Sequence, residues 1–170
     1  MNIYIMNESF DRPLDWMDAT DLRLLAELQR DASPSNLALA ERTHVSPATA
    51  LRRVKRLQQA GVIERQVAIL SPQALGAGLT AIIEVTLDGQ AIERLQAFEA
   101  RAAAEDGVQQ CYRVSGGPDF VLVVQVIDMP AYEALVQRLL TQDANVRNVR
   151  AFFSVHRAKF TPRIALPAAR

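Results

Sequence analysis

The feature that most constrains the fold of this chain is a change in hydrophobic periodicity near residue 70. Before this point apolar residues recur at the three- and four-residue spacing of amphipathic helices, and after it short apolar runs alternate with helical segments. A chain of 170 residues can bury the core of one domain or of two small ones. We therefore predict an α+β protein with a helical domain over residues 14–65, a linker strand and hinge over 66–78, and a sheet domain over 79–160.

Three short helices are predicted in the first part of the chain. The first begins at Asp18, a favourable N-cap residue, and the second covers residues 36–43. The third has the clearest boundaries, because Ser46 can cap it, Pro47 suits the first helical position and Gly61 lies just past its end. Two helices and a tight turn before a third helix are the elements of a helix-turn-helix.

The segments that flank these helices carry weaker signals. Residues 1–13 show no period, and we expect them to form a loose or exchanged arm. Apolar residues at 62–63 and 67–70 predict a short strand that leads out of the helical domain.

The third helix has an apolar face and a basic one. Ala50, Val54 and Leu57 fall together on a helical wheel and are expected to face the core. The segment 46–59 holds no acid but four cations, namely Arg52, Arg53, Lys55 and Arg56. A recognition helix presents such residues to the major groove, and Arg52 and Arg56 are expected to point away from the core and reach guanine edges or phosphates. A merely solvated basic face is the alternative.

The second part of the chain reads β-α-β-β-α-β, the order of a ferredoxin-like fold. Strands are predicted over 79–87, 107–115, 119–127 and 146–158, with helical apolar stripes between the first two and the last two. The strand 119–127 is apolar on both sides, although one face of such a sheet is usually solvated. We therefore expect the second face to be buried against another copy of the chain in a two-fold dimer.

The turn between the second and third predicted strands is the other candidate site. Gly116 and Gly117 expose backbone amides that can receive an anion such as a carboxylate, and Asp119 could meet an ammonium group. Together these groups suit an α-amino acid, whereas a simple hairpin turn is the alternative.

Composition narrows the function classes. Lys plus Arg and Asp plus Glu each number 19, which excludes a polycation but allows a local basic patch. The one cysteine, Cys111, has no predicted histidine partner, and with two histidines it cannot form an ordinary zinc site. We expect no catalytic site, no cofactor, no membrane partner and a cytoplasmic location, because no signal or membrane-spanning segment is evident.

Several motifs together resemble the Lrp/AsnC (feast/famine) transcription regulators. They lie between about residues 17 and 159 and comprise Met17-Asp18 with Asp21 and Leu24-Leu25, Leu39-Ala40 with Arg42, Val45-Ser46-Pro47, Arg53-Val54 with Arg56-Leu57, Gly61-Val62-Ile63, and Val114-Ser115-Gly116 with Asp119-Phe120. His44 stands where the family commonly has glycine, which predicts modest strain if the backbone is left-handed there. Gly117 stands where an acidic residue is often found, which removes one partner for an ammonium group.

The resemblance implies a winged helix-turn-helix domain and a ferredoxin-like effector domain, called RAM. It implies a nucleoid-associated regulator of amino-acid metabolism or transport that binds promoter DNA, assembles from dimers into tetramers or octamers, and holds a small effector, an amino acid, between dimers. The expected DNA contacts are Ser46, Pro47, Thr49, Arg52, Arg53, Lys55 and Arg56, and the expected effector contacts are Tyr112, Arg113, Ser115, Gly116, Gly117 and Asp119. An architectural protein that wraps DNA without an effector, and a stand-alone sensor, are the alternatives.

Overall fold

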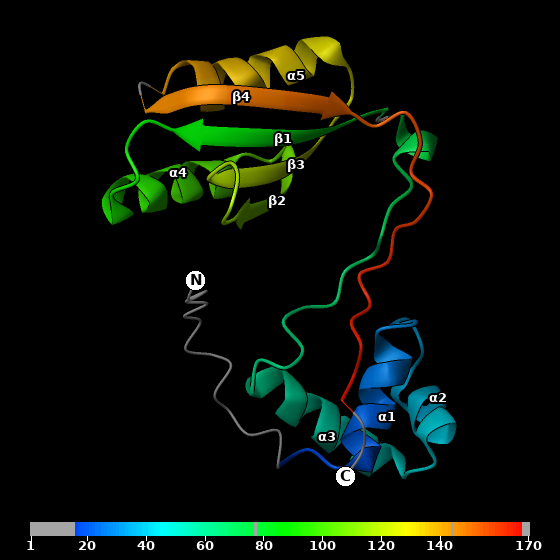
Figure 1. Cartoon of the computed structure of the whole chain (residues 1–170). Coiled ribbons are helices and arrows are strands. Elements are labelled where there is room, and N and C mark those ends of the chain that lie inside the picture. The colour runs from blue at the N-terminus through cyan, green and yellow to red at the C-terminus, as the bar shows by residue number, and fades with distance from the viewer. Residues whose placement is uncertain (1–15, 77, 144, 168–170) are drawn as a thin grey trace. The chain divides into compact units, whose positions relative to one another are not determined.

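The computed structural model describes residues 16–76, 78–143 and 145–167, so the arm expected at residues 1–13 lies outside the described residues. The chain forms two compact units (Figure 1). One runs to Ala68 and includes the segment from Phe160 onward, and the other is Ile69–Lys159. In the first unit, the Gln29 side chain exchanges two hydrogen bonds of 3.1 Å with the backbone of Ile164.

The first unit contains the three predicted helices, α1 (Ala19–Leu28), α2 (Asn36–Thr43) and α3 (Pro47–Gln59). Each begins at a side-chain cap, because Asp18, Ser35 and Ser46 accept hydrogen bonds from the first backbone amides of the helix that follows. Their shared core contains Leu24, Leu39, Ala40 and Ala50.

The turn between α2 and α3 depends on one residue in the left-handed region. His44 has φ +58° and ψ +47°, and its amide bonds back to α2. Residues other than glycine are strained in this left-handed conformation, because their Cβ atom crowds the backbone. The backbone strain that the sequence predicted at His44 is therefore present.

The strand expected at residues 62–63 and 67–70 does not form. Val67, Ile69 and Leu70 are exposed, and only a 3₁₀ turn (Gln73–Leu75) follows before the sheet. Within the described part of the chain no strand pairs with this segment. Without a neighbouring strand its backbone N–H and C=O groups have no ladder hydrogen bonds to form, so the apolar run does not become a strand.

The second unit is the predicted four-stranded antiparallel sheet in the order β2-β3-β1-β4. Its strands are β1 (Leu79–Leu87), β2 (Val108–Arg113), β3 (Phe120–Val126) and β4 (Val146–Phe153). The helix α4 (Ile92–Ala104) follows β1, and α5 (Met129–Val136) follows β3 and continues as a π-helical turn, Gln137–Thr141. The ferredoxin-like order is confirmed, although β4 ends five residues earlier than expected.

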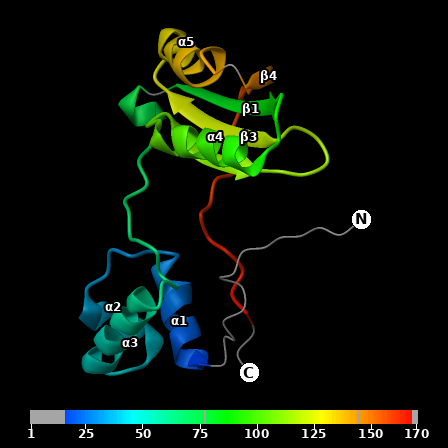
Figure 2. The same ribbon diagram turned by 90° about the vertical axis from the view of Figure 1, so that its left-hand side faces the viewer.

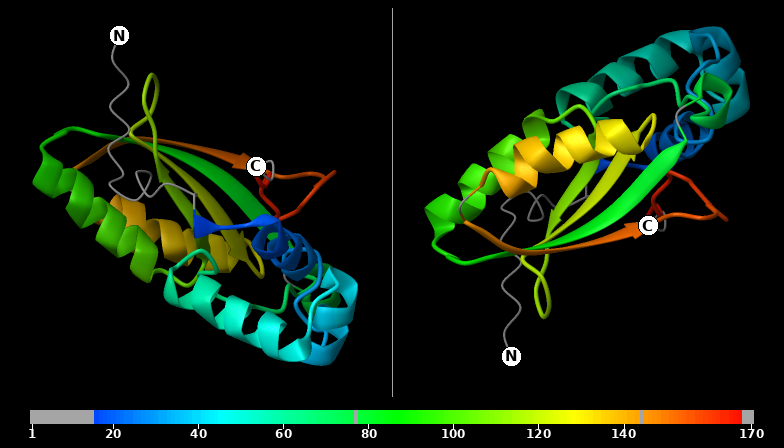
Figure 3. Two further views of the ribbon diagram at one scale, coloured as in Figure 1. Left: turned by 90° about the horizontal axis from the view of Figure 1, so that it is seen from below. Right: turned by 90° about the horizontal axis from the view of Figure 1, so that it is seen from above.

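Both helices cover the same face of the sheet (Figure 3). Phe98 of α4 and Phe120 of β3 pack with ring centroids 4.7 Å apart, and Leu135 of α5 is buried on the same side. The core is completed by Ala81, Ile83, Val85, Leu87, Ala102, Leu122, Val124, Leu139 and Leu140.

The other face of the sheet is mixed rather than uniformly apolar. Ile82 pairs with Val123 on one side and with Phe152 on the other, and Ile82 and Phe152 are both exposed. Polar groups flank this patch, because Glu84 and Arg150 form an ion pair of 3.2 Å on the same face.

Candidate nucleic-acid interface and effector turn

The start of α3 lies beside the start of α2. The Asn36 side-chain amide donates a hydrogen bond of 2.8 Å to the carbonyl oxygen of Pro47, which fixes the two helix starts together. Ser46 and Pro47 are exposed there. Thr49 is half-buried, and its hydroxyl accepts a hydrogen bond of 2.9 Å from the Ser46 hydroxyl, so it also supports the cap. A helix start of this kind presents free backbone amides to an anion such as a phosphate.

Arg52 and Lys55 project into solvent from the outer face of α3. In the part of the chain that the structure describes, neither side chain forms an ion pair. Their charges are therefore available to a polyanion.

Arg53 and Arg56 instead turn toward α1. Arg53 Nη1 lies 3.0 Å from Asp21 Oδ1 and 2.8 Å from Asp18 Oδ1, and Arg56 Nη2 lies 2.6 Å from Asp21 Oδ2. The Asp21 side chain has no solvent exposure. The expectation that Arg56 points away from the core is wrong, because the buried carboxylate lies across the helix interface and draws both guanidinium groups inward.

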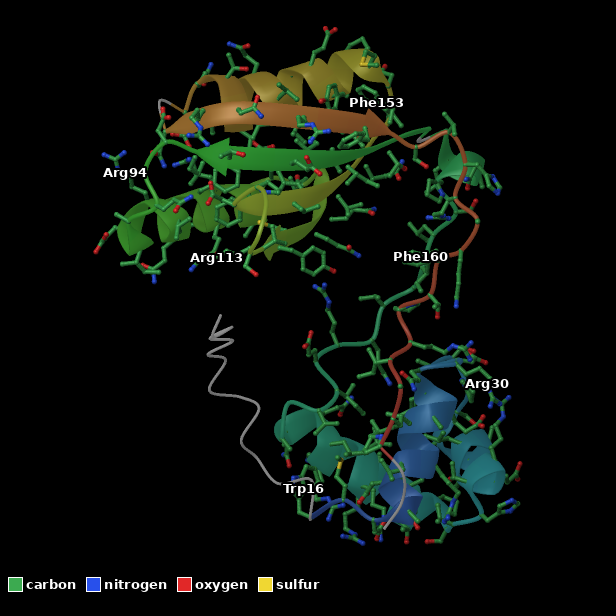
Figure 4. The ribbon with its side chains drawn as sticks, in the orientation of Figure 1. Trp16, Arg30, Arg94, Arg113, Phe153 and Phe160 are labelled. Atoms are coloured by element: carbon green, nitrogen blue, oxygen red, sulfur yellow. The ribbon has the colours of Figure 1, made fainter. Side chains whose placement is uncertain are left out.

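The environment of these groups favours their charged forms. Hydrogen bonds from the Asp21 amide and from Arg53 lower the pKa of the Asp18 carboxyl, and its bonds to Asp18 and Asp21 raise the pKa of Arg53. Arg56 also contacts Trp16, which is labelled in Figure 4, and its guanidinium carbon lies 5.0 Å from the centroid of the tryptophan ring. The basic face of α3 is thus divided into two solvated cations and two cations held by α1.

The ion pairs between Asp21 and the arginines of α3 were not predicted from the sequence, although the position of Asp21 indicates that it needs such partners. Asp21 lies at the helical spacing of Leu24, Leu25 and Leu28, which form the apolar stripe of α1. A carboxylate on a buried stripe needs a cation or several donors, because an unpaired buried charge is costly. A basic helix in the same small domain was the available source.

The candidate effector turn, residues 115–119, projects beyond the sheet between β2 and β3 (Figure 2). Gly116 has φ +85°, and Ser115, Gly116 and Gly117 are exposed. Added Cβ atoms at Gly116 and Gly117 would meet nothing within 4 Å, so open space lies beside both glycines.

Asp119 is already engaged within its own unit. Its carboxylate accepts a hydrogen bond of 2.7 Å from the Leu87 amide and one of 2.9 Å from the Gln90 side chain. These bonds tie the base of the turn to the end of β1. Asp119 therefore positions the turn, whatever else it contacts.

The structure does not bring Tyr112 and Arg113 together. Neighbouring residues of a strand point to opposite faces of a sheet. Arg113 forms a two-pronged ion pair with Glu99 of α4, at 2.7 and 2.8 Å, on the helix-covered side. Tyr112 is exposed, and its hydroxyl donates a hydrogen bond of 3.1 Å to Gln110. A ligand at one face can meet one of these two residues directly, not both.

A pocket in this unit was not singled out from the sequence. It lies at the opposite end of the sheet from the turn, where β1 begins and β3 ends, and its lining includes Thr80, Gln125, Ser154 and His156. Within this lining the Thr80 hydroxyl donates a hydrogen bond of 2.6 Å to Gln125 Oε1, its partner on the neighbouring strand.

The described residues were also compared with the requirements of a metal site, a reactive thiol and a membrane-spanning helix. They contain no group of three or more histidine, cysteine, aspartate or glutamate side chains that could hold a metal ion. Burial raises the pKa of the half-buried Cys111 thiol, which disfavours the reactive thiolate. None of the helices described is long and apolar enough to cross a membrane.

The fold and the site define a class of protein, a helix-turn-helix DNA-binding protein with a separate α+β domain. Two family models match the chain: a winged helix-turn-helix DNA-binding domain over residues 17–64 and the Lrp/AsnC ligand binding domain over residues 80–164. The chain is 34% identical over 161 residues to the leucine-responsive regulatory protein of Salmonella typhimurium, covering 95% of this chain and 98% of that relative.

Solved structures agree. An AsnC family transcriptional regulator from Agrobacterium tumefaciens matches with a TM-score of 0.81 and 30% identity, covering 88% of this chain and 97% of the other. A transcriptional regulator of Neisseria meningitidis in complex with L-Met matches with a TM-score of 0.80 and 30% identity, covering 88% and 96%. The chain belongs to the Lrp/AsnC family, and it is a transcriptional regulator rather than an enzyme.

Proposed function

We propose that α3 is the recognition helix of this regulator and that Arg52 and Lys55 carry its cationic contacts to promoter DNA. The observation that carries this proposal is the division of the basic face, since Arg53 and Arg56 are held by the carboxylates of α1. The exposed Ser46 and Pro47 lie at the helix start, where backbone amides can meet a phosphate. Arg53 and Arg56 then act indirectly, by holding α3 in place.

We propose that this recognition helix acts in a two-fold dimer. Helix-turn-helix dimers place their recognition helices about 34 Å apart, one turn of duplex, and read near-palindromic sites. We propose that the exposed patch of Ile82, Tyr112 and Phe152 joins two copies sheet to sheet, and that dimers assemble further into tetramers or octamers. Sedimentation of a stable monomer at micromolar concentration would contradict this assembly.

The proposal is tested with DNA selected from a random pool by the wild-type protein. Fluorescence anisotropy then compares wild type with the R52A/K55A double variant on the selected duplex. Loss of two phosphate or base contacts should weaken binding by at least ten-fold. Arg30→Ala is the matched control, because Arg30 is an exposed cation of the same unit whose one ion pair among the described residues is with Glu27 on α1. Equal affinity of R52A/K55A and wild type would contradict the assignment.

We propose that the effector is an amino acid bound beside the turn at Ser115, Gly116 and Gly117, where exposed amides can receive its carboxylate. The match to a ligand binding domain and the L-Met complex of the Neisseria relative support this class of ligand. Control of amino-acid metabolism or transport, by a regulator associated with the nucleoid, follows as part of the proposal.

Thermal unfolding in the presence of each common amino acid and its keto-acid relative tests the effector. A ligand at about 100 times its Kd stabilises the folded protein by about 2.7 kcal/mol, which shifts the melting temperature measurably. A shift for one chemical class identifies the effector class, and Gly116→Val should abolish the shift. No shift with any compound contradicts the effector assignment.

A second candidate function is architectural DNA wrapping without an effector. Two observations favour it. The Asp119 carboxylate already accepts hydrogen bonds from Leu87 and Gln90. Gly117 also stands where the family often has an acidic residue. Architectural wrapping predicts weak sequence preference in the selection experiment and no response to any metabolite. A preferred near-palindrome whose footprint changes with an amino acid excludes it.

A further inference from the structure

Leu51 is an aliphatic side chain on the outer face of α3. Its exposed fraction is 60%, whereas Ala50 and Leu57 of the same helix are fully buried. Arg52 follows it directly, and Ala48 and Lys55 lie one turn before and one turn after it on the exposed side. Leu51 therefore lies on the same exposed face of α3 as the two solvated cations.

The position of Leu51 limits what it can contact if α3 lies in the major groove. Its side chain has no donor or acceptor, so the amino, carbonyl and N7 groups of the bases offer it no hydrogen bond. The apolar group that base edges display in this groove is the 5-methyl of thymine. Covering any other base edge would leave a polar group without water or partner.

We propose that Leu51 is a specificity-determining residue that contacts the 5-methyl group of a thymine in each half-site. This inference rests on the proposed function, because it requires α3 to be the recognition helix. On this exposed face of α3, Arg52 and Lys55 provide the positive charge that attracts DNA. Leu51 distinguishes thymine from the other bases by contact with its methyl group.

The test replaces each thymine of the selected duplex, one position at a time, with deoxyuridine. This substitution keeps base pairing and removes only the 5-methyl group. Burial of one methyl is equivalent to a change of about four-fold in affinity. Wild type should therefore lose about four-fold at one thymine in each half-site, whereas L51A should bind the thymine and deoxyuridine duplexes equally.

Leu37→Ala is the matched control. Leu37 is 58% exposed in the same unit but lies on α2, so the L37A variant should keep the wild-type response to deoxyuridine. Circular dichroism of L51A should be unchanged, because the side chain is not part of the core.

Three results would overturn the proposal. L51A could respond to deoxyuridine as wild type does, or no thymine position could matter to wild type. L51A could also change the sedimentation of the protein and leave the response intact, which would place Leu51 at a contact between copies. Failure of the proposed function is distinguishable, because R52A/K55A would then bind the selected duplex as tightly as wild type does, whatever the response to deoxyuridine.

Discussion

Replacing Asp21 with Asn should destabilise the helical unit far more than an average surface change. The Asp21 carboxylate has no solvent exposure and accepts hydrogen bonds of 3.0 Å from the Asp18 amide and Arg53 and 2.6 Å from Arg56. Asn keeps the size and one acceptor but removes the charge that faces two guanidinium groups.

The expected loss of stability depends on which partners and how much solvent contact Arg53 and Arg56 keep in the D21N variant. Removing one partner of a buried ion pair costs about 3–5 kcal/mol. Here the Arg53 and Arg56 side chains keep exposed fractions of 18% and 41%, and Arg53 keeps Asp18, so both recover part of their stabilisation from water and neighbours. We therefore expect D21N to lower the free energy of unfolding by about 2–3 kcal/mol, at or just below the lower limit of that range.

Tryptophan emission provides the assay. Trp16 is the single tryptophan of the chain and lies against Arg56, so its fluorescence during urea unfolding reports on this unit. With a slope of about 1 kcal/mol per molar urea for a small unit, the midpoint should fall by about 2–3 M. Asp31→Asn is the control, because the exposed Asp31 side chain accepts hydrogen bonds from Ser33 in a local turn, and its one ion pair among the described residues is a 3.9 Å contact with Arg42. A D21N midpoint within 0.5 M, roughly, of wild type would refute the structural role of Asp21.

Three further predictions concern the stability of the two units. His44→Gly should raise the stability of the helical unit by about 1 kcal/mol in urea, because it relieves the left-handed strain at φ +58°, and a loss of stability would contradict this. Gly107→Ala should cost the sheet unit about 1–3 kcal/mol in calorimetry, since a Cβ there would lie 2.6 Å from Leu135 Cδ1, and an unchanged melt would show that α5 can yield. The helical unit should lose stability as the pH falls below about 4. The pKa of Asp18 is lower in the folded state than in the unfolded state, so the folded state binds fewer protons and this stabilisation is present above that range and lost below it. D18N should flatten the profile.

Local chemistry was enough to predict most of the elements. Ser46 and Pro47 fix the start of α3, Asp128 fixes the start of α5, and strand periodicity gives β1 with its observed bounds. Residues 67–70 show where this reasoning fails, because an apolar run becomes a strand only when another strand pairs with it. That partner is a property of the whole fold.

The candidate site was predicted less well than the fold. A helical wheel gives the direction of Arg53 and Arg56 but not the identity of the group opposite, and Asp21 lies more than thirty residues earlier in the chain. The separation of Tyr112 and Arg113 onto opposite faces follows from strand alternation and could have been predicted. The DNA and effector contacts themselves remain predictions.

The salt dependence of DNA binding tests the division of the basic face most directly. The logarithm of the affinity falls linearly with the logarithm of the salt concentration, and each lost phosphate contact reduces the slope by about 1. We predict a reduced slope for R52A and for K55A, and an unchanged slope for R53A and R56A measured where both variants remain folded. A slope reduced by R53A or R56A, with R52A and K55A unchanged, would contradict the account.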